Sequence, residues 1–182
     1  MLYQKLDVVD HSRTKRMEIA TFVIDHPESI LPLMEIVFDV THPLSVKACF
    51  SLEYTAKNKL ALLLPHLDYF IHHLPVLRNE SALRTAAKTC ELLILDYYTA
   101  KTSITKPYLS HSQLEKITTV TFDWLIGTHK VATKAHAMTC LYHLGCDFSW
   151  IHPELQLILE QQFGVESAAF KARARHILAK FK

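Results

Sequence analysis

Basic residues at five points of the chain are each followed, at helical spacing, by small or apolar residues. They are Arg16, Lys47, Arg84, Lys134 and Lys171. A small or apolar residue stands three positions after each of them, and an apolar residue stands six or seven positions after it. These spacings keep the small and apolar side chains on one face of a helix. The pattern predicts five helices over residues 11–25, 44–57, 79–98, 129–145 and 165–181, which we call the second helices.

Four further segments with helical periodicity lie between them, and we call these the first helices: residues 28–40, 59–74, 110–126 and 153–163. Two of them open on start signals, since Ser110 can cap a helix together with Gln113, and Pro153 suits a first turn. Pro32 and Pro65 fall inside the other two, where each removes a backbone hydrogen bond and should bend or interrupt the helix. The polar stretch over residues 99–107 is predicted to be a longer loop.

Three glycines, Gly127, Gly145 and Gly164, each stand just after an apolar-periodic run. This is the position at which a helix commonly ends in the left-handed conformation, for which glycine is preferred. The sequence contains no sustained alternation of apolar and polar residues and no Asn-Gly or Asp-Gly turn that would indicate strands. The sequence therefore predicts one all-α domain over residues 1–182.

The stretch over residues 28–57 contains, in order, Leu31-Pro32-Leu33, Asp39, Pro43 and Val46-Lys47-Ala48. It resembles one HEAT repeat, the armadillo-type pair of antiparallel helices. The five basic residues are 31, 37, 50 and 37 positions apart, close to the roughly 40-residue period of such repeats. The resemblance implies an α-α superhelix, a short HEAT-like solenoid of about four helical pairs plus an N-terminal helix. A compact helical bundle is the alternative. A fragment of a fumarase-type lyase is set aside because the glycine-serine-rich loop of those enzymes is missing.

Charge is divided unequally between the two sets of helices, although the net charge of the chain is only +2. The second helices hold 13 basic and 7 acidic residues, whereas the first helices, with their flanking residues, hold 2 basic and 8 acidic residues. In a HEAT-like stack the second helices line the concave face, so the resemblance implies a basic inner surface that favours an acidic partner. The candidate binding residues are Arg16, Lys47, Arg84, Lys88, Lys130, Lys134, Lys171 and Arg175, with Arg13, Lys15 and Arg173 as further candidates. Alternatively, the basic residue of each second helix forms a ladder of bonds between neighbouring repeats.

Twelve histidines raise the question of a metal site. His129, His136 and His143 repeat every seven residues along one stripe of a helix, but each heptad rises about 10 Å, so the three cannot share one ion. His136, Cys140 and His143 are an alternative set for zinc or copper if another helix supplies ligands. We expect satisfied, partly buried side chains instead, and we expect neither a metal nor a cofactor.

Nucleophile and phosphate motifs are not found, since no Ser or Cys lies in a glycine-flanked elbow and no glycine-rich loop exists. A non-enzymatic scaffold that binds another protein or an acidic peptide is therefore the leading interpretation. The alternative is a nucleic-acid-binding HEAT-like protein related to the alkylpurine DNA glycosylases, which place Trp, Asp and Arg on a basic concave face. Trp124 and Trp150 belong to or follow first helices, so no catalytic residue carries over.

The remaining features concern location. No apolar run approaches the roughly 20 residues needed to cross a bilayer, and the first ten residues do not form a secretory signal. The four cysteines lack paired metal or redox spacing and are expected to be reduced and mostly buried. These features favour a cytoplasmic protein that does not bind a membrane.

Overall fold

The computed structural model describes residues 1–10 and 12–181, and every regular element in these ranges is helical. The helices are α1 Leu2–Asp7, α2 Arg13–Asp25, α3 Ile30–Phe38, α4 Ser45–Asn58, α5 Leu67–His73, α6 Glu80–Thr99, α7 His111–Ile126, α8 Val131–Leu144, α9 Ile151–Phe163 and α10 Ala168–Leu178. Short 3₁₀ turns flank several of them, at Pro27–Ser29, Leu60–His66, Leu74–Val76 and Ala179–Phe181. All nine predicted segments are helical over most of their length, which confirms the all-α prediction. His11, the predicted start of the first segment, lies outside the described residues.

Helix α1 was not predicted. It is short, and its only pattern is the pair Leu2 and Leu6, which stand one turn apart and are both buried. A single pair at i and i+4 is too little to distinguish a helix from an extended start of the chain.

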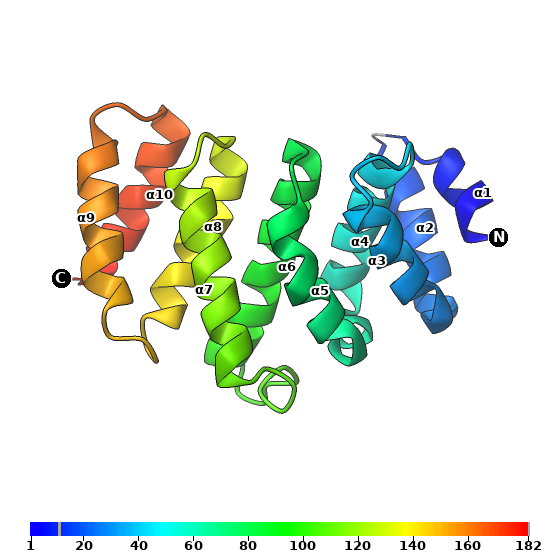
Figure 1. The fold of residues 1–182 in the computed structure, drawn as a ribbon, viewed down its shortest axis with the longest axis horizontal. Helices are drawn as coiled ribbons and strands as arrows, with labels where there is room; N and C mark the ends of the chain where they lie inside the picture. Colours follow the sequence, from blue (N-terminus) through cyan, green and yellow to red (C-terminus); the bar gives the residue numbers. More distant parts are fainter. Residues whose placement is uncertain (11, 182) are drawn as a thin grey trace.

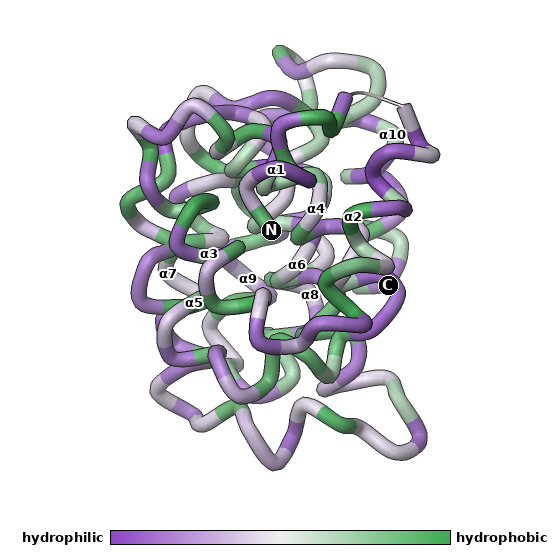
Figure 2. The backbone as a smooth tube through the Cα atoms, turned by 90° about the vertical axis from the view of Figure 1, so that its right-hand side faces the viewer, coloured by the Kyte–Doolittle hydropathy of each residue, from purple (hydrophilic) through white to green (hydrophobic). Residues whose placement is uncertain are grey.

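The helices follow one another along the longest axis of the molecule, from α1 at one end to α9 and α10 at the other (Figure 1). Helices α2, α4, α6, α8 and α10, which we call the second-helix row, each contact the next member of the row. Helices α3, α5 and α7 lie to one side of this row, and α9 packs on α8 and α10 at its end; we call these four the first-helix row. The view down the long axis has α3, α5 and α7 on one side and α2 and α10 on the other (Figure 2).

Small residues allow the members of the second-helix row to approach one another closely. Ala48 and Cys49 of α4, Ala87 and Cys90 of α6, and Ala137 of α8 are all fully buried. Larger apolar side chains from the first-helix row close the core on the other side. The core is continuous along the molecule, so the helices of each pair bury apolar surface against neighbouring pairs as well as against each other.

Helix starts follow the chemistry that the sequence indicates. The capping box at α7 is confirmed, because the Gln113 backbone N–H donates to Ser110 Oγ at 3.3 Å and the Ser110 N–H donates to Gln113 Oε1 at 2.8 Å. Pro65 lies in the 3₁₀ turn before α5, so the predicted interruption is confirmed there. Pro32 lies in the first turn of α3, where a missing N–H costs no intrahelical bond, and it does not break that helix.

The predicted role of the glycines is wrong. Gly127, Gly145 and Gly164 do follow α7, α8 and α9, but no glycine among the described residues has a positive φ. At Gly145 the requirement is space instead, because a Cβ atom there would lie 2.0 Å from Cδ2 of His152. His152 Nε2 lies 2.7 Å from the carbonyl oxygen of Tyr142, which fixes the imidazole against the glycine.

The loop between α6 and α7 accounts for the longest gap between the second helices. Asp96 Oδ2 accepts hydrogen bonds from the backbone N–H groups of Ile104 at 3.0 Å and Thr105 at 2.9 Å, and from Ser103 Oγ at 2.8 Å. Although burial raises the pKa of Asp96, these donors outweigh it and the pKa is lowered. One carboxylate therefore orders a loop that has no secondary structure of its own.

Cysteine placement agrees with the expectation of mostly buried thiols. Cys49, Cys90 and Cys140 are buried, Cys146 is exposed, and all four are free. Burial raises the pKa of the Cys49 thiol to about 12. Among the described residues, no helix has the length and apolar character needed to span a membrane.

Candidate binding face

The second-helix row carries most of the candidate cations, beginning with those on α2 and α4. The Arg16 guanidinium of α2 lies over the Phe50 ring of α4, with its carbon 3.9 Å from the ring centroid. Lys47 of α4 donates to the backbone carbonyl of Asp7 and lies 3.7 Å from the Asp7 carboxylate. Both cations thus join neighbouring segments of the chain.

The seam between α4 and α6 contains a buried carboxylate, Glu53, whose side chain is 4% exposed. It accepts from Lys57 on its own helix at 2.6 Å and from the Arg84 guanidinium of α6. Burial raises the pKa of Glu53, but these two cations outweigh it and the pKa is lowered. Arg84 and Lys57 together therefore compensate a charge that would be costly to bury unpaired.

A second buried carboxylate, Glu91, lies in the seam between α6 and α8. It accepts from Lys88 at 2.6 Å, and His136 Nδ1 of α8 lies 2.9 Å from the same Oε2 atom. Burial raises the pKa of Glu91, yet the bonds from His136 and Lys88 prevail and hold the pKa at about 2. Lys88 and His136 are therefore tied to one internal anion.

The heptad histidines, His129 just before α8 and His136 and His143 within it, contact α6 along that seam. His129 Nδ1 lies 2.9 Å from Oε1 of Glu80, whose other oxygen accepts the backbone N–H of Lys130 at 3.0 Å. His136 meets Glu91, and the His143 ring stacks on Tyr98 with 6.2 Å between centroids. The stripe is thus a helix-to-helix contact. No group of three or more metal-ligating side chains exists among the described residues, and Cys140, from the alternative metal set, is fully buried.

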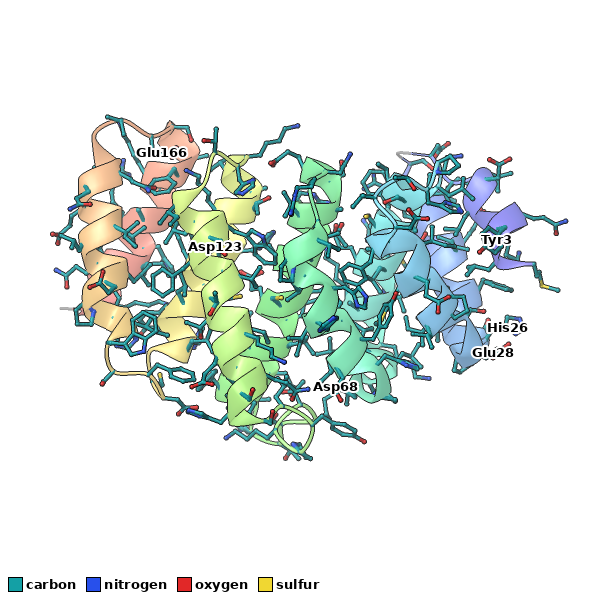
Figure 3. The ribbon with its side chains drawn as sticks, viewed as in Figure 1. Tyr3, His26, Glu28, Asp68, Asp123 and Glu166 are labelled. Carbon is teal, nitrogen blue, oxygen red and sulfur yellow. The ribbon has the colours of Figure 1, made fainter. Side chains whose placement is uncertain are left out.

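The cations near the C-terminal end have four different environments. Lys134 is only 6% exposed and donates to Glu166 at 2.5 Å, at the end of the row where α10 begins (Figure 3). Lys171 donates to the Gly164 carbonyl at 3.2 Å, and Arg175 lies 5.6 Å from the Phe163 ring centroid. The side chain of Lys130 is exposed.

The structure therefore brings the eight candidates onto one row of helices but not into one free patch. Four pair with carboxylates (Lys47, Arg84, Lys88 and Lys134), three lie over aromatic rings (Arg16, Lys134 and Arg175), and two donate to backbone carbonyls (Lys47 and Lys171). Arg173, a further candidate, donates to Thr139 Oγ1 at 3.3 Å across the α8–α10 seam. These contacts favour the ladder interpretation, and a role of the same residues in partner binding stays a prediction.

Sequence reasoning missed the two buried carboxylates that organise the ladder. Each has a local signal, since Lys57 follows Glu53 by four residues and Lys88 precedes Glu91 by three, spacings typical of pairs on one helix. Nothing in the sequence indicates that the same carboxylates also reach the next helix. The two tryptophans have ordinary packing roles, with Trp124 buried in α7 and Trp150 stacked on Phe122 at 5.4 Å between centroids.

A groove on the second-helix row completes the candidate face. It lies between α8 and α10, has a volume of about 590 Å³, and is lined by Val131, Ala132, Ala135, Ala169, Ala172, Arg173 and His176. Comparison of the chain with protein families, with curated proteins and with solved structures finds no match.

Proposed function

We propose that the chain is a HEAT-like helical-repeat scaffold, non-enzymatic, that binds an acidic protein or peptide on the face of the second-helix row. The observation that carries the proposal is the division of charge between the rows. The helices α2, α4, α6, α8 and α10 contain 11 Lys and Arg against 6 Asp and Glu, whereas α3, α5, α7 and α9 contain 1 against 6. A surface with an excess of one charge attracts partners of the opposite charge.

The internal ion pairs restrict where such a partner would bind. Along α4 and α6 the cations Lys57, Arg84 and Lys88 are already paired with the carboxylates Glu53 and Glu91. Helices α8 and α10 contain no Asp or Glu at all. The excess of positive charge is therefore greatest at this end of the row, and we place the contact with the acidic partner there.

The test compares two charge reversals of equal size. The variant Lys130→Glu/Arg175→Glu changes two exposed cations at the α8–α10 end, and the control Lys59→Glu/Lys116→Glu changes two exposed cations of the first helices and their flanks. Fluorescein-labelled polyglutamate and duplex DNA are titrated with each protein over a salt series, with anisotropy as the readout. We expect the first variant to weaken polyglutamate binding at least about tenfold and the control to leave it nearly unchanged.

Three results would overturn the proposal. They are the absence of polyglutamate binding at low salt, equal weakening by both variants, and DNA binding tighter than polyglutamate binding with a steep salt slope. The last result would favour the nucleic-acid alternative.

A further inference from the structure

The groove between α8 and α10 differs from the other seams of the second-helix row. At the α2–α4 seam Arg16 covers Phe50, at the α4–α6 seam Arg84 meets Glu53, and at the α6–α8 seam His136 meets Glu91. At the α8–α10 seam four alanine methyl groups face the groove, so the two helices leave a hollow that their own side chains do not fill.

The floor of the groove is apolar and its rim is cationic. Ala169 and Ala172 are exposed, and Ala132 and Ala135 are half-buried. Arg173 lines the groove while its guanidinium donates to Thr139 Oγ1 at 3.3 Å, and the exposed His176 lines it one turn further along α10. The bond to Thr139 limits the motion of the guanidinium, so a ligand that uses this charge loses less side-chain entropy.

The helices that line the groove carry charge of one sign, and Glu80, which lies at the start of α8, is already in contact with His129 and the backbone N–H of Lys130. Neither α8 nor α10 contains a carboxylate, and Glu166, just before α10, is already bonded to Lys134 at 2.5 Å. The exposed Lys130 precedes the groove residue Val131. Helices α8 and α10 both begin at the upper edge of the view in Figure 1. Their dipoles therefore add positive potential along that edge.

We propose that this groove binds a short acidic peptide segment of a partner protein, which places an apolar side chain between the alanines and carboxylates on the cationic rim. This inference rests on the proposed function and specifies its partner. The groove volume lies within the roughly 300–1,000 Å³ of typical ligand pockets. Its lining contains no aromatic residue except His176, so it lacks the stacking platform that single-stranded nucleic acid requires. An apolar anchor inside a charged rim is instead the arrangement of protein interfaces.

The test uses a displayed library of random peptides of about a dozen residues, selected on the full chain and resynthesised with fluorescein for anisotropy. The variant Ala172→Trp fills the groove at an exposed position, and Ala61→Trp adds the same side chain at an exposed position before α5. We expect the enriched peptides to combine Asp or Glu with an apolar residue. We also expect their affinity to fall at least about tenfold for Ala172→Trp and to stay unchanged for Ala61→Trp.

Several outcomes would overturn the inference: no enriched peptide, enrichment of neutral or basic peptides, or equal affinity for wild type and Ala172→Trp. Light scattering that detects a dimer of the wild type and a monomer of Ala172→Trp would assign the groove to a second copy of the chain. If polyglutamate binding responds to Lys130→Glu/Arg175→Glu while the peptides ignore Ala172→Trp, the proposed function stands and the groove assignment fails. If polyglutamate does not bind either, both fail.

Discussion

Replacing Arg84 by methionine tests whether this residue serves the fold. Methionine keeps most of the aliphatic length and removes the charge that faces Glu53. The Glu53 carboxylate is only 4% exposed, so it would keep Lys57 as its one cationic partner. Removing one member of a buried ion pair costs about 3–5 kcal/mol, since an uncompensated charge stays in the core. Because Lys57 still binds Glu53 at 2.6 Å, we expect Arg84→Met to lower the free energy of unfolding by about 2–3 kcal/mol. This corresponds to a fall in Tm of roughly 5–10 °C.

The assay is urea unfolding followed by circular dichroism, for wild type, Arg84→Met, Glu53→Gln and the double variant. The ladder predicts that Glu53→Gln restores part of the stability lost in Arg84→Met, with a coupling energy of about 1–2 kcal/mol, because the neutral amide no longer needs the guanidinium. This reasoning would be refuted if the free energy of unfolding of Arg84→Met lay within about 0.5 kcal/mol of that of wild type. If that unperturbed variant also lost polyglutamate binding, Arg84 would be a partner-binding residue instead.

Three further predictions follow from single contacts. The pKa of Glu91 is about 2, below the ordinary 4.5. The ionised Glu91 carboxylate therefore contributes its full stabilisation above about pH 4.5, and this stabilisation is lost as the pH falls toward 2. Urea midpoints of Glu91→Gln should depend less on pH in this window than those of wild type. Gly145→Ala should lower stability by about 1–3 kcal/mol because its Cβ would collide with His152, whereas Gly164→Ala, with no atom within 4 Å of the added Cβ, should not; equal Tm values for both would contradict the packing argument. Ellman's reagent should titrate one thiol of the native protein rapidly, that of Cys146, and all four after unfolding, and fast reaction of more than one native thiol would contradict the described burial.

Most of the fold could be predicted from periodicity, because nine helices bury one face and so leave a spacing of three, four and seven residues in the sequence. The capping box at Ser110 and the 3₁₀ turn around Pro65 were also predictable, since both depend on backbone groups within a few residues. Gly145 was predicted at a helix end for the wrong reason. Its requirement is the approach of His152, which is a tertiary contact without a local pattern.

The candidate face was less predictable for a related reason. Charge along the chain correctly indicated that cations gather on the second helices. It did not indicate that Arg84 and Lys134 meet Glu53 and Glu166, which lie about 30 residues away in sequence. Whether a cation is free or neutralised depends on such long-range neighbours. The groove between α8 and α10 was also invisible in the sequence, because alanines there look the same as alanines in the core.

The buried carboxylates also determine which helix can stack on which, and at what height. Alanine and leucine surfaces attract without direction, so two smooth helices have several nearly equal ways to pack. Sliding α6 by one turn along α4 would move Arg84 about 5.4 Å from Glu53 and leave that buried anion with Lys57 as its one cationic partner. The seams of the second-helix row differ in their polar partners. An arginine lies on a ring at the α2–α4 seam, and an arginine meets a glutamate at the α4–α6 seam. Histidines meet glutamates at the α6–α8 seam, and a lysine meets a glutamate at the α8–α10 seam. We expect these differences to favour the native order and register of the helices over mispaired stacks and exchange between copies.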